Sequence, residues 1–151
     1  MTITLNKFLI NKGYSSVKLI FLKTKHYLIE CKVNGVEGKF ILDSGASNSC
    51  VCNSLEKKFK IESKKNTIKA SSATSEMTNT NLSKKNEIQI GKWSDKLNLI
   101  TFDMNHINKT LSEKGIDSID GIVGADVLKK SNAILDYNKN KLYLKLWSNR
   151  F

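Results

Sequence analysis

The sequence predicts a mainly β fold, a barrel or a sandwich, built from many short strands with little helix. Runs rich in β-branched and aromatic residues begin near Val17 and recur to the end of the chain. Asn34-Gly35 separates two of these runs, and both residues tolerate the positive φ that a type I′ hairpin turn requires. No repeat and no linker divides the 151 residues into two cores, so we expect one domain over residues 1–151.

The first part of the chain, residues 1–25, is expected to form an extension made of a helix and a strand. Leu5, Phe8 and Leu9 fit one face of a short helix, and Gly13 would end that helix as a C-cap. The first strands are predicted over three runs: Val17–Leu22, Tyr27–Val33 and Val36–Leu42.

Beyond the hairpin, Asn53 and Glu56 have the spacing of a capping box, which predicts a short helix to about Phe59. The polar stretch 64–85 is either a hairpin or an unstructured linker. Asp103 is expected to cap a helix that runs to about Leu111. The remaining predicted elements are strands over Ile88–Lys92, Leu97–Phe102, Ala133–Tyr137 and Lys141–Trp147, a loop over Ser112–Asp120 and a helical turn over Ala125–Lys130.

The formal net charge of +11 raises the possibility of a nucleic-acid partner, because basic clusters bind phosphates. The basic residues are scattered along the chain, however, and Arg150 is the only arginine. No helix-turn-helix or zinc-finger spacing is present either. A solvated basic surface is therefore favoured over a nucleic-acid-binding domain.

The number of cysteines is odd, three, in a chain without a secretory signal: Cys31, Cys50 and Cys52. We expect reduced, packed thiols in a cytoplasmic protein. The longest uninterrupted apolar run near the N-terminus, Leu19–Leu22, is too short for a signal peptide or a membrane span, so no membrane partner is expected.

Asp43 has the most informative surroundings in the sequence. It follows the apolar run Phe40–Leu42 directly and precedes Ser44-Gly45. An Asp-Ser-Gly turn at the end of a strand is common and often only structural. Alternatively, a carboxylate at this position could be oriented for chemistry by backbone N–H groups and by the Ser44 hydroxyl.

A second apolar run, Ile122-Val123-Gly124, ends on glycine and leads into a predicted helical turn. Together with Asp43-Ser44-Gly45-Ala46, this run resembles the retropepsin-like aspartic proteases, cellular and bacterial-type members more than minimal viral enzymes. The resemblance extends from about Tyr27 to Trp147. It implies a closed β-barrel with the acid-protease fold of a single lobe, with short helices that include an N-terminal one.

The resemblance also implies an activity, aspartic endopeptidase, with no cofactor and no metal. Asp43 would be the catalytic carboxylate, present once per chain, so a homodimer would bring two copies together. Ser44 would hydrogen-bond across the dimer axis. The catalytic loop would be supported by Ser44, Gly45, Ala46, Ile122, Val123 and Gly124.

Peptide or protein substrate would bind between this loop and a flap around Ala70–Leu82. The substrate-binding candidates are Ser47, Asn48, Ser75, Glu76 and Met77. Here the sequence departs from the viral pattern, because the segment Ser71–Thr80 contains no glycine and Ser47 stands where an Asp is common.

Other residues are weaker candidates for chemistry. His26 and His106 lack partners at zinc-like spacing and are expected to be ordinary histidines. Asp117, Asp120 and Asp126 are expected to be helix caps or solvated loop charges. Two other functions remain open: a catalytically idle dimerisation or peptide-binding module with the same fold and, less favoured, the basic nucleic-acid-binding domain.

Overall fold

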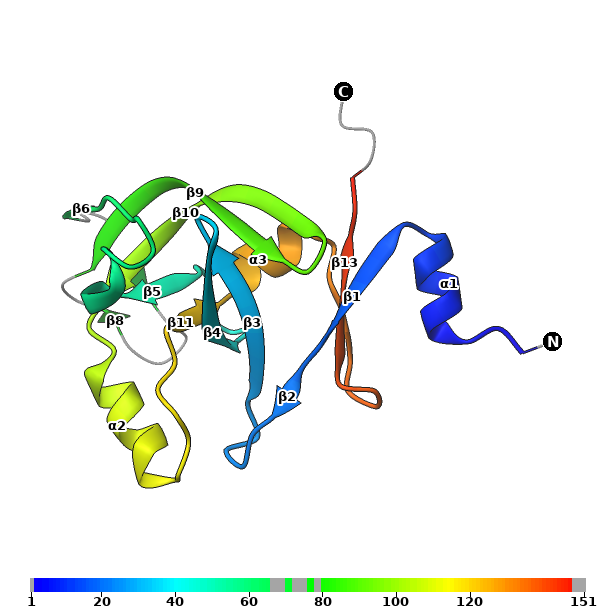
Figure 1. Cartoon of the computed structure of the whole chain (residues 1–151), viewed down its shortest axis with the longest axis horizontal. Helices are drawn as coiled ribbons and strands as arrows, with labels where there is room; N and C mark the ends of the chain where they lie inside the picture. Colours follow the sequence, from blue (N-terminus) through cyan, green and yellow to red (C-terminus); the bar gives the residue numbers. More distant parts are fainter. Residues whose placement is uncertain (1, 66–69, 72–75, 78–79, 148–151) are drawn as a thin grey trace.

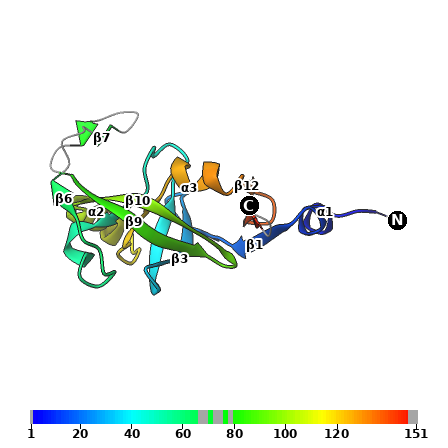
Figure 2. The same cartoon turned by 90° about the horizontal axis from the view of Figure 1, so that it is seen from above.

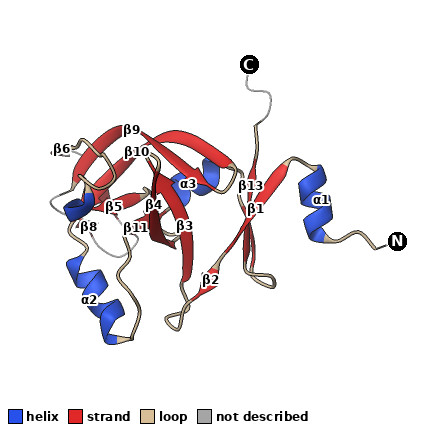
Figure 3. Ribbon diagram, viewed as in Figure 1, coloured by secondary structure: helices blue, strands red, loops and turns tan. Residues whose placement is uncertain are grey.

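A computed structural model describes residues 2–65, 70–71, 76–77 and 80–147 of the chain. Strands account for more of the molecule than helices do, and helices α1 and α2 lie at its opposite ends (Figure 3). The helices are α1 (Leu5–Asn11), the 3-10 helix η1 (Asn53–Leu55), α2 (Asn105–Glu113) and α3 (Ala125–Lys130). The strands are β1 (Tyr14–Lys18), β2 (Ile20–Phe21), β3 (Tyr27–Val33), β4 (Val36–Leu42), β5 (Cys50–Cys52), β6 (Lys64–Lys65), β7 (Ala70–Ser71), β8 (Glu76–Met77), β9 (Asn81–Ile90), β10 (Trp93–Phe102), β11 (Gly121–Val123), β12 (Ile134–Asp136) and β13 (Lys141–Lys145).

The main sheet closes into a mixed six-stranded barrel, which confirms the predicted fold class. Its order is β3-β4-β11-β5-β10-β9, and pairing of β9 with β3 completes the ring. The β4–β11 and β5–β10 pairs are parallel, while the others are antiparallel. Strands β2 and β6 extend this sheet outside the ring (Figure 1).

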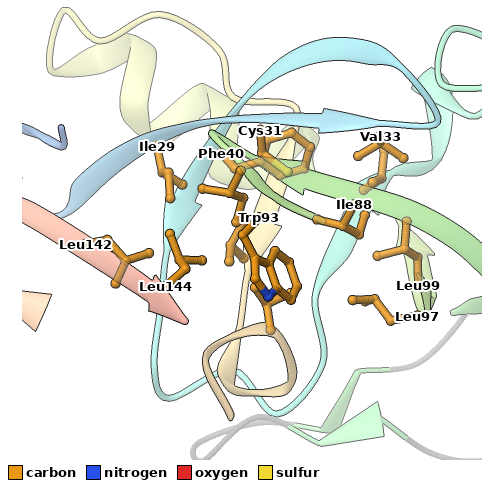
Figure 4. Close-up of a cluster of buried hydrophobic side chains, with 14 of the residues drawn as sticks. Ile29, Cys31, Val33, Phe40, Ile88, Trp93, Leu97, Leu99, Leu142 and Leu144 are labelled. Carbon is orange, nitrogen blue, oxygen red and sulfur yellow. The ribbon is translucent and has the colours of Figure 1, made fainter. Parts of the chain in front are cut away.

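A separate antiparallel sheet, β1-β13-β12, lies between the barrel and α1 (Figure 1). Leu142 and Leu144 on β13 are fully buried and join the core inside the barrel. Figure 4 shows both pointing toward the same interior as Ile29 and Trp93. The second sheet and the barrel therefore share one hydrophobic core.

Alternating burial along the barrel strands explains how the core forms. On β3, Tyr27, Ile29, Cys31 and Val33 are buried, and the residues between them are more exposed. Side chains of a strand point alternately to its two faces, so this period-two pattern places one apolar face inside the barrel. The β3–β4 hairpin turns at Asn34 and Gly35, with φ of 49° and 82°, as predicted.

The predicted N-terminal helix is also confirmed. Thr4 Oγ1 accepts a hydrogen bond from Lys7 N at its start, and Gly13 follows its end with φ of 88°. Leu9 packs inward, and Tyr143 donates a hydrogen bond to Asn6 Oδ1 at 3.1 Å. No helix among the described residues is long and apolar enough to cross a membrane.

Two local predictions were wrong. The run Val17–Leu22 is divided between two sheets, because Leu19 N donates to Asn140 O and β2 then pairs with β3. Asn53 does not start a capping box, since η1 has no side-chain cap. Glu56 instead accepts hydrogen bonds from the hydroxyls of Ser63 and Thr101, so a tertiary contact replaces the local one.

The helix after Asp103 begins at Asn105, whose backbone N–H donates to the Asp103 carboxylate at 2.8 Å. The stretch 64–85 contributes β6, β7, β8 and part of β9, and β7 pairs with β8 as a hairpin. Seen from above, β7 stands away from the barrel (Figure 2).

The three thiols are free and buried, as expected from the sequence. Burial raises the pKa of the Cys31 and Cys50 thiols to about 12, because a thiolate loses its hydration inside the barrel. We predict that the native protein resists alkylation by iodoacetamide at about pH 8, since the thiolate is the reactive form. All three cysteines should react in denaturant, and mass spectrometry would follow both reactions.

The raised thiol pKa also determines how the stability of the native state changes with pH. A thiol whose pKa is raised by folding stabilises the native state at any pH below the pKa that the thiol has in the unfolded chain. That contribution disappears as the pH rises toward about 12. Rapid modification of Cys50 in the folded protein at neutral pH would contradict this description of the core.

Candidate active site

The loop Asp43–Ser49 joins β4 to β5 and carries the sequence's most informative carboxylate. Asp43 follows the last residue of β4, and its side chain is exposed. Gly45 N donates to Asp43 Oδ1 at 2.9 Å, and Ala46 N donates to Asp43 O at 3.1 Å. This tight turn gives the carboxylate a defined orientation while leaving it accessible.

The second predicted motif lies directly beside this loop. Strand β11 runs parallel to β4, with Ile122 opposite Ile41 and Val123 opposite Leu42. Val123 O accepts a hydrogen bond from Asp43 N at 2.9 Å. Two short apolar segments that are distant in the sequence therefore end together, and the second fixes the backbone of the first.

Gly124 is required by close approach of the two segments. A Cβ at this position would lie 2.5 Å from Ala46 O, a distance that real side chains do not reach. Ala125 N donates to the same carbonyl at 2.7 Å. The glycine after β11 thus lets the start of α3 pack against the Asp43 loop.

Asp126 supports the Asp43 loop through contacts that the sequence reasoning missed. Its carboxylate accepts hydrogen bonds from Ser49 N at 2.9 Å and from Ser49 Oγ at 2.6 Å. The Ser49 hydroxyl in turn accepts from Gly124 N at 2.9 Å. Asp126 is half-buried rather than a solvated charge, and it ties the far end of the Asp43 loop to α3.

A cavity of about 280 Å³ lies beside Asp43 and Ser44. Polar and apolar groups contribute about equally to its wall, and its remaining lining residues are Lys25, His26, Tyr27, Leu42, Leu128, Ala133, Leu135, Tyr137 and Leu142. A cavity that combines apolar side chains with an accessible carboxylate is a common arrangement for a binding or catalytic site.

The other predicted site residues are placed in different ways. Ser47 and Asn48 are exposed on the loop, where Asn48 Nδ2 donates to Ser47 Oγ at 3.2 Å. Glu76 and Met77 form β8 in the hairpin with β7, while Ser75 lies outside the described residues. The loop candidates and the flap candidates therefore come from separate segments.

Asp120 is not part of the Asp43 site. It accepts a hydrogen bond from Lys39 N at 2.8 Å and lies 3.9 Å from Lys58 Nζ. Lys39 lies on β4, four residues before Asp43. At about 3.3 Å per residue, roughly 13 Å of extended chain separates the two. The Asp120 carboxylate therefore serves as a structural acceptor at a distance from the loop.

The remaining dismissed residues, Asp117, His26 and His106, are exposed. His26 nevertheless lines the cavity beside Asp43, and its Nδ1 lies 2.9 Å from Thr24 Oγ1. Within the described ranges, no three His, Cys, Asp or Glu side chains gather in a way that would hold a metal ion.

Comparison with known proteins gives the same family as these two motifs. The family model described as "Aspartyl protease" matches residues 29–127, which include both motifs. Among curated proteins, none matches this chain significantly.

Two solved structures are similar in fold. A retropepsin-like aspartic protease from Rickettsia conorii has a TM-score of 0.57 and 19% identity, with 87% of this chain and 90% of that chain covered. EIAV protease in complex with an inhibitor has a TM-score of 0.54 and 15% identity, with 78% and 98% covered. At these identities the likeness shows the fold alone.

The Asp126–Ser49 contact generates a prediction about stability. Asp126→Ala leaves the buried Ser49 N–H and hydroxyl without their acceptor and should lower the free energy of unfolding by about 1–3 kcal/mol. Urea denaturation would measure the change. Asp126→Asn, which keeps acceptor capacity, should lose less.

Asp117→Ala is the matched control, because this aspartate is exposed in a loop and should change stability by less than about 0.5 kcal/mol. Equal stability of Asp126→Ala and Asp117→Ala would show that the Ser49 contact contributes nothing.

Proposed function

The chain belongs to the retropepsin-like aspartyl protease family, and from this membership we propose that it is an aspartic peptidase whose active site forms between two copies of the chain. Each copy would supply one Asp43. The observation that carries the proposal is the exposed Asp43 carboxylate, oriented by Gly45 N and supported by Val123 O from the second motif.

The proposed chemistry needs two carboxylates that share one proton. Two carboxylates at hydrogen-bonding distance do not both ionise readily, and aspartic proteases are the standard example of such a pair. The ionised member takes a proton from water, whose oxygen then bonds to the carbonyl carbon of the scissile peptide. The protonated member gives its proton to the carbonyl oxygen. Collapse of this tetrahedral species, with proton transfer to nitrogen, breaks the C–N bond.

A second chain is the natural source of the second carboxylate. Asp120 and Asp126 are both engaged in structural hydrogen bonds, and Asp120 lies far from the loop. Asp43, in contrast, is exposed beside the cavity.

Exposed aromatic residues next to the same cavity support a partner on this side. The rings of Phe21 and Tyr137 flank Tyr27, with centroid distances of 5.1 and 5.3 Å. Phe21 is 52% exposed and Tyr137 is 68% exposed. Large apolar side chains exposed together in this way are typical of a protein–protein interface. We propose that the second copy covers them.

The β7–β8 hairpin is the proposed flap over bound peptide. Closure of such a segment excludes water and positions the substrate. The absence of glycine from Ser71–Thr80 is the observation that favours the other candidate function, a peptide-binding module without turnover. A stiff flap would permit binding while slowing closure and release.

Replacement of Asp43 tests the proposal. Asp43→Asn keeps the shape of the side chain but removes its proton-transfer group, so cleavage of a diverse peptide library should fall at least about a hundredfold. Mass spectrometry would detect the products, and thermal unfolding would establish that the variant is folded. Asp117→Asn serves as the matched control and should retain full activity.

Near-normal cleavage by folded Asp43→Asn would overturn the proposed catalytic role. Peptide binding without cleavage by the unaltered protein would instead favour the idle module.

A further inference from the structure

A second concave surface, which shares no lining residue with the cavity beside Asp43, carries a concentrated positive charge. It has a volume of about 720 Å³ and lies between the segment that leads into β6 and the first half of β9. Five exposed lysines line it, and one glutamate, Glu62, offsets them. These lysines, Lys60, Lys64, Lys65, Lys84 and Lys85, define the basic groove.

The charges of the basic groove are not neutralised within the described part of the chain. There, the lysines in ion pairs are Lys58, with Asp120, and Lys130, with Asp95, and neither lines the groove. Five like charges in one concavity repel one another and oppose folding. A bound anion would relieve that repulsion.

Hydrogen bonds beneath the lysines make the floor of the groove rigid. Asn34 Nδ2 donates to Phe59 O and to Asn86 Oδ1, both at 2.9 Å. Glu87 N donates to Asn34 Oδ1 at 3.0 Å, and Asn86 Nδ2 donates to Ser83 Oγ at 2.9 Å. This network joins the β3–β4 turn to both walls, so the groove exists before any ligand arrives.

The backbone conformation of two groove lysines also indicates that the groove is preformed. Lys60 and Lys85 have φ of 55° and 58°, in the left-handed region that residues other than glycine seldom adopt. Lys85 N also donates to Asn98 Oδ1 at 3.2 Å. The backbone from which these two lysine side chains extend is therefore held in place by the fold.

The walls of the groove are also the two strands from which the proposed flap extends. Strand β6 pairs with β9 through Lys64 opposite Leu82 and Lys65 opposite Asn81. The β7–β8 hairpin lies between these strands in the sequence. The basic groove therefore borders the base of the segment that carries the proposed flap.

The lining favours an acidic polypeptide over a nucleic acid. Among the described residues that form it, none is aromatic and none is arginine. Proteins that bind single-stranded nucleic acid typically stack bases on aromatic side chains and use arginine. Lysine ammonium groups pair well with single carboxylates, which need no bidentate geometry.

We propose that the basic groove binds an acidic segment of the peptide or protein substrate, outside the cleft that contains Asp43. The proposal rests on the proposed function for its biological use, but binding to the groove does not require turnover. It adds a substrate class, polypeptides with a Glu- or Asp-rich stretch, to the proposed peptidase.

The test is fluorescence anisotropy with a labelled twelve-residue peptide of Glu, Ser and Gly, titrated with the full chain at low salt. Because the readout is binding, failure of peptidase activity would not affect it. Two variants carry equal changes in net charge. The groove variant replaces Lys64, Lys65, Lys84 and Lys85 with Gln. The control variant replaces four exposed lysines outside the groove with Gln: Lys7, Lys109, Lys114 and Lys139.

The unaltered protein should bind the peptide, and binding should weaken as salt screens the charges. Each exposed charge pair changes the dissociation constant by a factor of about two. Loss of four lysines should therefore weaken binding by the groove variant about sixteenfold, while the control variant should change by less than about threefold.

Equal weakening in the two variants would show that net charge alone attracts the peptide and would overturn the proposal. No binding by the unaltered protein would overturn it as well. A groove variant that loses affinity for a single-stranded oligonucleotide but not for the peptide would assign the groove to nucleic acid instead.

Discussion

The parallel pairing of β4 with β11 is the interaction on which the rest of the site depends. It brings the ends of two apolar strands together and lets Val123 O accept the hydrogen bond of Asp43 N. Gly124 then permits the close approach of Ala46, and Asp126 binds Ser49 at the other end of the loop. The Asp43 carboxylate is thus exposed on a loop whose backbone is fixed at both ends. Such a rigid support is what a proton-transferring group requires.

Charge imposes a second constraint on the proposed enzyme. Two copies of a chain with a formal charge of +11 repel each other over long range, so their association must depend on short-range apolar contact. The cavity beside Asp43 and the exposed rings of Phe21 and Tyr137 supply apolar surface for that contact. The same net charge attracts acidic polypeptides, and the basic groove would give that attraction a defined place.

Local signals in the sequence were sufficient for much of the barrel. Strands β3 and β4 begin and end where their apolar patterns and the Asn34-Gly35 turn predict. The two motifs at Asp43 and Gly124 were also visible, because each follows its own apolar run. Features that depend on distant partners could not be predicted in this way. Asp126 bonds to Ser49, which belongs to another segment.

Dependence on distant partners also explains the remaining differences between the sequence-based predictions and the structure. The spacing of Asn53 and Glu56 predicts a capping box, but Glu56 accepts a hydrogen bond from Thr101 on β10 instead. The groove lysines belong to two segments, 60–65 and 84–85, and their convergence follows from the pairing of β6 with β9. In the sequence alone these lysines are indistinguishable from a scattered basic surface.

The central claim is that two copies of the chain each contribute one Asp43 to one active site. Its most direct test is the peptidase activity of mixtures of unaltered and Asp43→Asn chains at constant total concentration, after subunits have exchanged. If both carboxylates are required, activity should follow the square of the unaltered fraction, and an equal mixture should retain about one quarter of full activity. Activity that falls linearly, to about one half in that mixture, would mean that each chain acts alone and would contradict the shared site.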